Sequence, residues 1–456
     1  MTLNHDMPRT TGTTGSPWRV ITATGVGNFV EWFDYAIYGF TATVIASQFF
    51  PSTDETASLL ATFAVFAISF FLRPVGGLVF GAMGDRLGRR VTLMTTILLM
   101  AAGTTAIGLL PTYDNVGVLA PILLVVARCT QGLAAGGEYA GAASFVVEHS
   151  PPSRRGFFSS FLSCSTFFAF ACGALFTSLL SAVLGQEAFS SWGWRLAFLV
   201  VTPLGLIGLY LRLKLEESPA FRRLQEEQSV AEAPIKEAFR THARPMALLF
   251  VFFMNAIVMS YMLVAYIPTY LLKNSELSHD TVRLSNVVAI LFLVACFPFF
   301  GLLCDRVGRR PVAILACILL AVVAIPGFLL IAEGSLGLVI LGQCLLALPV
   351  AASNPVNTLL MTEFFPTRIR YSSAAVSYNS ANMVVGGTAP LVAILLVSQT
   401  GSALAPAYYA AVIGVLALLA ALRLPETRNR SLFEGDHIPA ARFSREEPVA
   451  TDEGTP

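Results

Sequence analysis

Long apolar runs separated by short polar clusters dominate this chain of 456 residues. Hydrophobic residues make up 55% of the sequence and charged residues only 12%, whereas soluble domains carry roughly 25% charged residues. A run of about 20 apolar residues is long enough to cross a lipid bilayer as a helix. The runs are continuously apolar and do not alternate, which excludes a membrane β-barrel. The sequence therefore predicts an all-α membrane protein.

We expect twelve membrane-spanning helices. The apolar runs place them near residues 18–45, 57–82, 91–110, 117–147, 157–184, 191–213, 245–272, 283–303, 312–331, 335–361, 372–398 and 403–424. One set of connections holds most of the arginines, and the other set holds little beyond Arg195, Lys273 and Arg283. Because basic residues stay on the cytoplasmic side, we expect both termini in the cytoplasm and the protein in a bacterial-type inner (plasma) membrane.

The longest predicted internal connection divides the chain into two halves. We expect a cytoplasmic tail at 1–17, a six-helix bundle at 18–213, a cytoplasmic loop at 214–244, a second six-helix bundle at 245–424 and a cytoplasmic tail at 425–456. The last tail has no heptad repeat, so it predicts no coiled coil.

Two motifs occur once in each half and in the same order. GAMGDRLGRR (81–90) and GLLCDRVGRR (301–310) follow the second and eighth predicted spans. EHSPPSR (148–154) and EFFPTR (363–368) follow the fourth and tenth. Duplicated halves are typical of alternating-access transporters, which bind substrate near the middle of the membrane between the repeats. The sequence thus predicts two pseudo-symmetric six-helix bundles.

The repeated turn has two interpretations, and we favour the second. In the first, its positive charge only fixes the orientation of the chain in the membrane. In the second, the aspartate accepts hydrogen bonds and the arginines pair with acids at neighbouring helix ends, which forms a latch that closes the cytoplasmic side. Orientation alone would require neither aspartate nor glycine. The predicted latch residues are Asp85, Arg86, Arg89, Arg90, Glu148, Asp305, Arg306, Arg309, Arg310 and Glu363.

Ionisable residues inside the predicted spans are candidates for proton coupling, because each costs roughly 2.5–3.5 kcal/mol or more at the membrane midplane. Glu31, Asp34, Tyr35 and Tyr38 share one face of the first span. Two carboxylates this close are not both expected to be ionised, so one should hold a proton near neutral pH. Glu138 is the third candidate. The alternative is a structural set bonded to helix neighbours or to an arginine.

Two arginines are also predicted inside the membrane. Arg128 is either a counter-ion for Glu31 or Asp34 or an anchor for a substrate carboxylate, and both interpretations stay open. For Arg73, beside Pro74, the intramembrane counter-ion is favoured. The second half has almost no charge at this depth. The candidate substrate-binding residues are Arg128, Tyr35, Tyr38, Gln131, Tyr139, Tyr261, Asn354 and Asn379.

No pattern in the sequence indicates an enzyme, a metal centre or a nucleic-acid binder. The five histidines are scattered through tails and loops, and the seven cysteines form no CxxC pair. A net charge of +1 without a basic stripe predicts no nucleic-acid partner. We expect no cofactor and no metal. The expected partners are a small organic acid or zwitterion, protons and membrane lipids, with the chain acting as a monomer.

Five segments together resemble the major facilitator superfamily, and within it the metabolite:proton symporter family. They are GNFVEWFDYAIYGF (27–40), RPVGGLVFGAMGDRLGRR (73–90), QGLAAGGEYAGAASFVVEHSP (131–151), WGWRLAF (192–198) and EFFPTRIRYS (363–372). The resemblance implies rocker-switch alternating access, with Glu31, Asp34, Arg128 and Glu138 at positions that the family keeps charged or polar. Residues 110–124, 203–221 and 405–410 are most similar to the proline/betaine branch.

This resemblance implies proton-coupled import of a small carboxylate or zwitterion such as proline or betaine, driven by the proton gradient. An importer of a di- or tricarboxylate or an aromatic acid, of the 2-oxoglutarate, citrate or shikimate type, is the alternative, because Arg128 suits a carboxylate. Drug efflux is less favoured, since efflux antiporters carry a Gly-Pro-rich motif in span five and this span has only Gly173.

Overall fold

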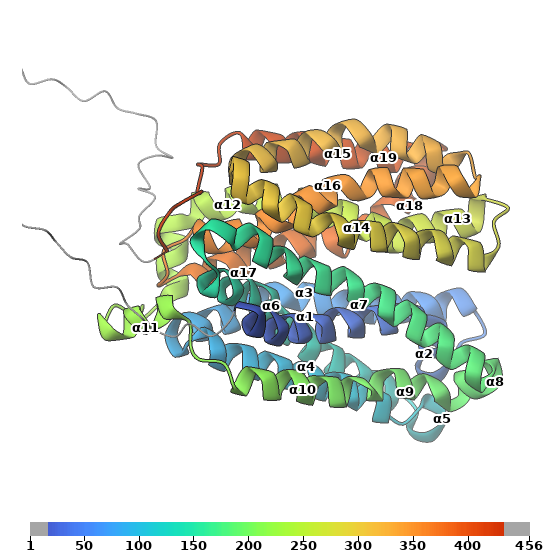
Figure 1. The fold of residues 1–456 in the computed structure, drawn as a ribbon. Helices are drawn as coiled ribbons and strands as arrows, with labels where there is room; N and C mark the ends of the chain where they lie inside the picture. Colours follow the sequence, from blue (N-terminus) through green and yellow to red (C-terminus); the bar gives the residue numbers. More distant parts are fainter. Residues whose placement is uncertain (1–16, 433–456) are drawn as a thin grey trace, which may run out of the picture.

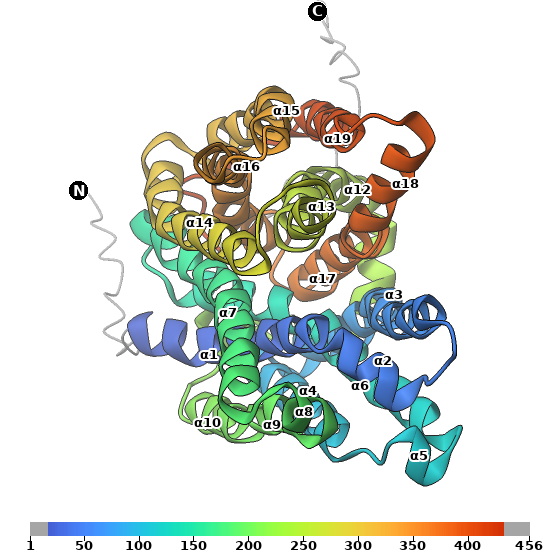
Figure 2. The ribbon, with the colours of Figure 1, turned by 90° about the vertical axis from the view of Figure 1, so that its right-hand side faces the viewer.

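The computed structural model describes residues 17–432, so residues 1–16 and 433–456 of the two predicted tails lie outside the described residues. Within the described range every regular element is a helix. Figure 1 shows two bundles side by side, the first half in blue to green and the second in yellow to red. The same two bundles are seen end-on in Figure 2. The all-α prediction is confirmed.

The first half runs from α1 to α10. Its helices are α1 (Pro17–Phe40), α2 (Ala42–Phe49), α3 (Glu55–Leu87), α4 (Arg89–Leu109), α5 (Tyr113–Val116), α6 (Leu119–His149), α7 (Arg155–Leu184), α8 (Gln186–Ala188), α9 (Trp194–Leu199) and α10 (Val201–Leu213). The helices of the second half are α12 (Pro234–Tyr261), α13 (Ile267–Asn274), α14 (His279–Val307), α15 (Arg309–Ala332), α16 (Leu336–Glu363), α17 (Arg370–Ala381), α18 (Ala389–Thr400) and α19 (Ala405–Ala421).

The described helices accommodate all twelve predicted spans. Ten helical stretches are long and apolar enough to cross a membrane, and α19 is a shorter apolar helix. The remaining span corresponds to α1, whose Asn28, Glu31 and Asp34 lower its hydropathy. Short π-helical turns at Phe189–Gly193, Met262–Tyr266 and Asn382–Gly386 interrupt three of the spans. Two other breaks lie outside these turns, since α1 and α2 are separated at Thr41 and α9 and α10 at Val200.

The connection predicted at 214–244 contains helical structure. It holds α11 (Pro219–Glu226) and the start of α12, which lie at the same end of the molecule in Figure 1. The backbone of α12 kinks at His242, where φ is −126° and ψ is 20°. Pro245 follows the kink, and the apolar part of α12 begins near it.

Two helix crossings bring the halves together. α17 packs against α3, and α14 packs against α7. Both crossings use the first glycine of the repeated turn. A Cβ atom on Gly81 would lie 2.8 Å from Cα of Ser372, and one on Gly301 would lie 2.5 Å from the carbonyl oxygen of Gly156. A larger residue at either position would push the halves apart, which explains why both copies of the turn begin with glycine.

A third close approach holds α3 against α6 within the first half. A Cβ atom on Gly136 would collide with the carbonyl oxygen of Arg73 and would lie 2.6 Å from the backbone nitrogen of Gly77. A Cβ atom on Gly132 would collide with the carbonyl oxygen of Ser69. These glycines therefore fix the position of Arg73 relative to α6.

Candidate functional site

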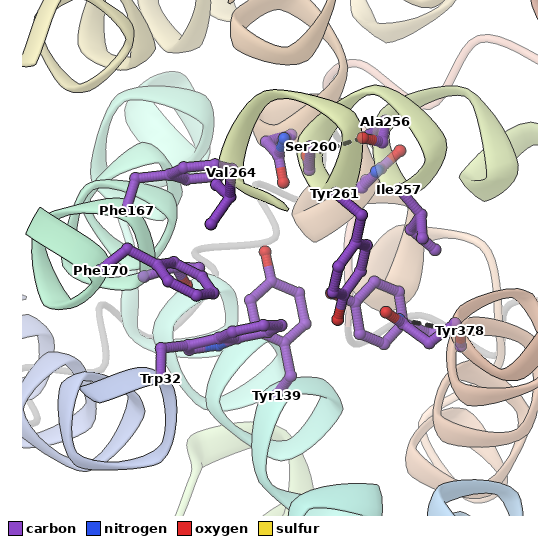
Figure 3. Close-up of a pocket in the computed structure, with 14 residues that line it drawn as sticks. Trp32, Tyr139, Phe167, Phe170, Ala256, Ile257, Ser260, Tyr261, Val264 and Tyr378 are labelled. Atoms are coloured by element: carbon purple, nitrogen blue, oxygen red, sulfur yellow. Dashed lines mark hydrogen bonds between the residues drawn. The ribbon is translucent and has the colours of Figure 1, made fainter. Parts of the chain in front are cut away.

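A pocket lies between the two halves (Figure 3). The residues that line it are Trp32, Tyr139, Thr166, Phe167 and Phe170 from the first half and Ala256, Ile257, Ser260, Tyr261, Val264, Asn354, Asn357, Tyr378 and Asn382 from the second. None of these lining residues is a lysine, arginine, aspartate or glutamate. The pocket wall is therefore aromatic and polar but formally neutral.

Aromatic rings from both halves form most of the wall. In Figure 3, Trp32, Phe167 and Phe170 lie on one side of the pocket, and Tyr261 and Tyr378 lie on the other. Tyr139 stacks on Tyr378 across the two halves, with ring centroids 4.8 Å apart and an interplanar angle of 16°. Aromatic faces attract cations, because the ring quadrupole places negative charge on the face. The wall can thus hold a cationic group without an acidic side chain.

Side-chain oxygens at the pocket have hydrogen-bonding capacity that the described residues do not use. Oδ1 of Asn357, Oδ1 of Asn382 and the hydroxyl of Tyr261 are buried and have no hydrogen-bond partner among the described residues. The amide group of Asn382 donates to the backbone carbonyl of Tyr378 at 3.2 Å, and that of Asn354 donates to the backbone carbonyl of Val350 at 3.0 Å. Buried polar groups are normally satisfied, so these oxygens are candidates for contact with a polar ligand.

Three carboxylate–arginine pairs are buried inside the first half. Glu31 accepts from Arg73 at 3.0 Å, and Asp34 accepts from Arg128 at 3.2 Å. Glu138 accepts from two nitrogens of Arg212, and the hydroxyl of Thr96 donates to the same carboxylate at 2.6 Å. The three predicted proton-coupling acids thus each have an arginine partner. Burial of a charge is tolerated only with such a partner.

Arg73 lies directly behind the pocket wall. Its guanidinium is 5.2 Å from the ring centroid of Trp32, 4.6 Å from that of Tyr35 and 4.9 Å from that of Phe70. Trp32 is itself a lining residue. Arg128 has a different environment, since its guanidinium lies 3.6 Å from the ring centroid of Tyr38, which does not line the pocket.

Three of the predicted substrate-binding residues, Tyr139, Tyr261 and Asn354, line the pocket. The other five do not, and each has a partner elsewhere. Tyr35 contacts Arg73, Tyr38 donates to the carbonyl of Thr62, Gln131 donates to Thr104, Asn379 donates to the carbonyl of Gly136 and Arg128 pairs with Asp34. The residues on the shared face of α1 therefore point into the first half, and a binding role for these five stays a prediction.

Several residues at the site have no counterpart in the sequence predictions. Arg212 lies at the end of a span and resembles a loop arginine in the sequence, yet it is buried on α10 against Glu138. Thr166, Phe167, Phe170, Ser260 and Val264 resemble ordinary span residues. The one available signal is that Phe167 and Phe170 are spaced three apart, which places both near one helix face.

The first repeated turn contacts the opposite half at one end of the bundle. Asp85 accepts the backbone N–H groups of Tyr371 at 3.1 Å and Ser372 at 2.8 Å. Arg370 donates to Glu148 at 2.6 Å. The side chain of Arg89 lies 3.4 Å from Asp85 and 3.8 Å from Glu148. A carboxylate at the start of α17 also complements the helix dipole.

The second turn repeats this arrangement with the halves exchanged. Asp305 accepts the backbone N–H groups of Gly156 and Phe157, each at 2.8 Å, at the start of α7. Arg309 donates to Glu363 at 2.8 and 2.9 Å. Arg155, from the first half, lies 3.6 Å from Glu363. Each half therefore caps a helix of the other.

The remaining predicted latch residues stay within their own half or face outward. Arg90 donates to the carbonyl of Leu213 at 2.5 Å, and Arg310 donates to that of Leu422 at 2.8 Å. Arg86 and Arg306 are exposed.

Two further acids, absent from the predictions, cap the helices that follow the turns. Glu217 accepts the backbone N–H groups of Arg89 and Arg90, and Glu426 accepts those of Arg309 and Arg310. Burial raises the pKa of the Glu217 carboxyl.

The sequence of this chain matches models of known protein families. Residues 24–297, more than half of the chain, match the model described as Major Facilitator Superfamily. The chain belongs to the Major Facilitator Superfamily. Residues 222–438 match the model described as Sugar (and other) transporter. This membership confirms the predicted resemblance and the predicted fold class.

Curated relatives of this superfamily member cover most of its length. It is 38% identical over 423 residues to the proline/betaine transporter of Escherichia coli (strain K12), an alignment that covers 91% of this chain and 84% of the relative. It is 39% identical over 423 residues to the glycine betaine/proline/ectoine/pipecolic acid transporter OusA of Dickeya dadantii (strain 3937), with the same coverage.

A solved structure shares the fold. The proton:xylose symporter XylE of E. coli, bound to 6-bromo-6-deoxy-D-glucose, superposes with a TM-score of 0.76 at 18% sequence identity, covering 91% of this chain and 97% of that chain. At that identity the likeness supports the fold alone. Family and relatives together establish a multi-pass membrane transporter and confirm that the protein is not an enzyme.

Proposed function

We propose that this transporter imports a small zwitterion, such as proline or glycine betaine, together with protons. The observation that carries the proposal is the neutral aromatic pocket between the halves, with the buried pair of Glu31 and Arg73 directly behind its wall. Relatives named as proline/betaine transporters, at 38% and 39% identity, support the same substrate class.

The residues that line the pocket offer partners for both ends of a zwitterion. A quaternary or secondary ammonium can lie against Trp32, Tyr139 and Tyr378, and a cation–π contact that is shielded from water contributes about 2 kcal/mol. The carboxylate end can accept hydrogen bonds from the hydroxyl of Tyr261 and from the amide of Asn357. The substrate has no net charge, so it enters a neutral pocket without a new counter-ion.

The neutral pocket wall disfavours a dicarboxylate or tricarboxylate as the substrate. A dicarboxylate or tricarboxylate carries a net negative charge and requires a free cation in the pocket. No lysine or arginine is among the lining residues. Arg128, the arginine predicted to bind a substrate carboxylate, is paired with Asp34, and Arg73 is paired with Glu31. To bind such an acid, the protein would have to break at least one of these ion pairs for each net negative charge on the substrate.

We further propose that the proton gradient alone drives transport, without a cofactor. The candidate proton carriers are Glu31 and Asp34, each of which makes one contact with its arginine. Glu138, with three donors on its carboxylate, is better suited to a permanent ion pair.

We place the protein in a bacterial-type inner membrane as a monomer, with both termini in the cytoplasm and bundles at 18–213 and 245–424. The positive-inside rule then puts the latch on the cytoplasmic side. There the contacts of Asp85 and Asp305 with the opposite half hold that side closed, and their opening provides alternating access.

Uptake into proteoliposomes tests the substrate class. The purified protein is reconstituted and offered radiolabelled proline, glycine betaine, 2-oxoglutarate, citrate and shikimate, with and without an inwardly directed proton gradient. The expected result is accumulation of proline or betaine, in excess of protein-free liposomes, and little uptake of citrate. Accumulation of citrate or 2-oxoglutarate in place of the zwitterions would contradict the proposal.

A further inference from the structure

The side chain of Asn382 carries an unused hydrogen-bond acceptor in the pocket wall. Asn382 lines the pocket at the start of the π-helical turn Asn382–Gly386, directly after α17. The residue is 1% exposed, and its Oδ1 atom is buried without a hydrogen-bond partner among the described residues. Buried amide oxygens are normally satisfied, so this atom is available to accept a hydrogen bond from a ligand.

The orientation of this amide group is fixed by the helix. Its Nδ2 atom donates to the backbone carbonyl of Tyr378, one turn earlier, at 3.2 Å. If the oxygen and the nitrogen of the amide exchanged places, two oxygens would face each other and neither could donate. The free atom of Asn382 is therefore the oxygen, which accepts hydrogen bonds and cannot donate one.

Gly386 leaves the space beside this oxygen. A Cβ atom on Gly386 would lie 3.1 Å from Oδ1 of Asn382 and 2.9 Å from Cε2 of Tyr261. Figure 3 shows Tyr261 and Tyr378 on the same side of the pocket. Asn382 follows Tyr378 by one helical turn, and the ring of Tyr378 stacks on that of Tyr139. The acceptor is thus a neighbour of the aromatic faces that attract an ammonium group.

Two hydroxyl groups of the pocket wall are already used within the protein. Thr166 accepts from the amide group of Asn28 at 2.8 Å, and its own hydroxyl donates to the backbone carbonyl one turn earlier at 3.3 Å. The hydroxyl of Ser260 donates to the backbone carbonyl one turn earlier at 2.7 Å. A ligand therefore finds these two groups occupied, whereas the amide oxygen of Asn382 is free to accept.

An ammonium group can serve this acceptor only if it carries an N–H bond. The secondary ammonium of proline has N–H donors, whereas the quaternary ammonium of glycine betaine has none. While the pocket is open to solution, water can donate to the oxygen of Asn382, and a bound substrate displaces that water. Proline replaces the lost hydrogen bond, but betaine leaves the oxygen buried and unpaired. A site that hydrogen-bonds an N–H group discriminates against the analogue without it.

We propose that the pocket selects zwitterions whose ammonium group carries at least one N–H bond, with Oδ1 of Asn382 as the acceptor. This inference rests on the proposed function and ranks the two kinds of substrate that the function includes. Proline-like amino acids bind more tightly than fully methylated betaines. The aromatic rings attract both kinds through their positive charge, so the discrimination comes from Asn382.

Proline, N-methylproline and N,N-dimethylproline test the inference, because they share the ring, the carboxylate and the net charge. They differ in carrying two, one and no N–H bonds. Isothermal titration calorimetry with the purified full-length protein measures the affinity for each compound. We expect N-methylproline to bind nearly as tightly as proline. We expect N,N-dimethylproline to bind about 5- to 100-fold more weakly, because it alone leaves the acceptor unpaired.

Replacement of Asn382 should remove this preference. Asn382→Leu lacks the acceptor, so it should bind proline about 5- to 100-fold more weakly and N,N-dimethylproline with unchanged affinity. Asn274→Leu is the matched control. The amide group of Asn274 makes the same kind of bond, to the carbonyl of Tyr270 at 2.9 Å, but this residue is exposed on α13 and does not line the pocket. It should bind all three compounds like the unmodified protein.

A second variant separates hydrogen bonding from size. Asn382→Ala enlarges the pocket, and it carries the test if the size-exclusion profile shows that Asn382→Leu does not fold. Loss of affinity for proline with unchanged affinity for N,N-dimethylproline supports the role of the acceptor. A gain in affinity for N,N-dimethylproline with unchanged affinity for proline would mean that methyl groups are excluded by size, and it overturns the inference.

The remaining outcomes are distinct. Equal affinity of the unmodified protein for all three compounds, or an equal loss with each added methyl group, overturns the selection by Asn382 and leaves zwitterion transport intact. If the unmodified protein binds none of the three compounds and no glycine betaine, the proposed substrate class fails together with the inference.

Discussion

Asp85 and Asp305 hold equivalent positions in the two halves, and each accepts two backbone N–H groups from the half to which it does not belong. Asp85 caps the start of α17 through Tyr371 and Ser372, and Asp305 caps the start of α7. The two contacts are related by the internal repeat of the sequence. They join the bundles at the same end of the molecule and give the repeated turn a role that positive charge alone does not require.

Removal of one of these carboxylates should shift the balance of states toward the one in which the two bundles are separated at that end. Asp85→Asn loses the charge that complements the dipole of α17, and a lost cap costs about 1 kcal/mol, which is about a fivefold change in the balance of closed and open states. Distances between spin labels at Leu87→Cys and Val307→Cys, both exposed at the ends of α3 and α14, would report the opening in a background without native cysteines. Asp114→Asn, exposed at the other end of the molecule, is the control. An unchanged distance distribution in Asp85→Asn would count against the latch.

The pair between Glu148 and Arg370 should matter for stability more than either aspartate. Both side chains are buried and meet at 2.6 Å across the halves. Removal of one partner from a buried pair costs about 3–5 kcal/mol, because the other charge stays buried. Arg370→Gln should therefore lower the melting temperature in detergent markedly. The double variant with Glu148→Gln should lose less than the sum of the single variants, and strict additivity would show that the two residues do not act as a pair.

The aromatic wall should select for a positive charge. Glycine betaine and 3,3-dimethylbutanoate have the same shape, but only betaine carries the quaternary nitrogen. Trp32→Leu removes one aromatic face of the pocket, so the affinity for betaine should fall about 2- to 30-fold. Competition against betaine uptake measures this, with 3,3-dimethylbutanoate inhibiting poorly in the unmodified protein. Equal inhibition by both compounds would argue that shape, and not cation–π contact, governs binding.

The packing of α3 on α6 should tolerate no methyl group at Gly136. A Cβ atom there collides with the backbone of α3 next to Arg73, and overpacking typically costs about 1–3 kcal/mol. Gly136→Ala should therefore lower both the melting temperature and transport. Gly39→Ala is the matched control, because a Cβ atom at that helical position has no atom within 4 Å. Similar stability of the two variants would mean that α3 and α6 are not held this closely.

The fold is largely predictable from the sequence because the lipid bilayer constrains each apolar segment separately. A continuous apolar run must form a helix to satisfy its backbone, so the number and order of the spans follow from hydropathy. The kink at His242 has a local signal, since Pro245 follows three residues later in the same helix. The π-helical turn at Asn382–Gly386 has no such signal in the sequence.

The site is less predictable because its geometry depends on how each helix is rotated. The shared face of Glu31, Asp34 and Tyr38 follows from helical spacing, but that face points into the first half. The pairing of Glu138 with Arg212 is also not predictable, since Arg212 lies 74 residues further along the chain and at the end of a predicted span. Only tertiary contact identifies such a pair.

A pH-sensitive dye inside proteoliposomes reports whether protons enter together with the zwitterion. Proteoliposomes containing the purified protein are loaded with a pH-sensitive dye, and glycine betaine or proline is added outside without an imposed gradient. We expect substrate entry to acidify the lumen and a proton ionophore to abolish this signal. We also expect an imposed inward proton gradient to drive accumulation above the external concentration. Substrate entry without acidification, and accumulation that ignores the gradient, would contradict proton-coupled uptake.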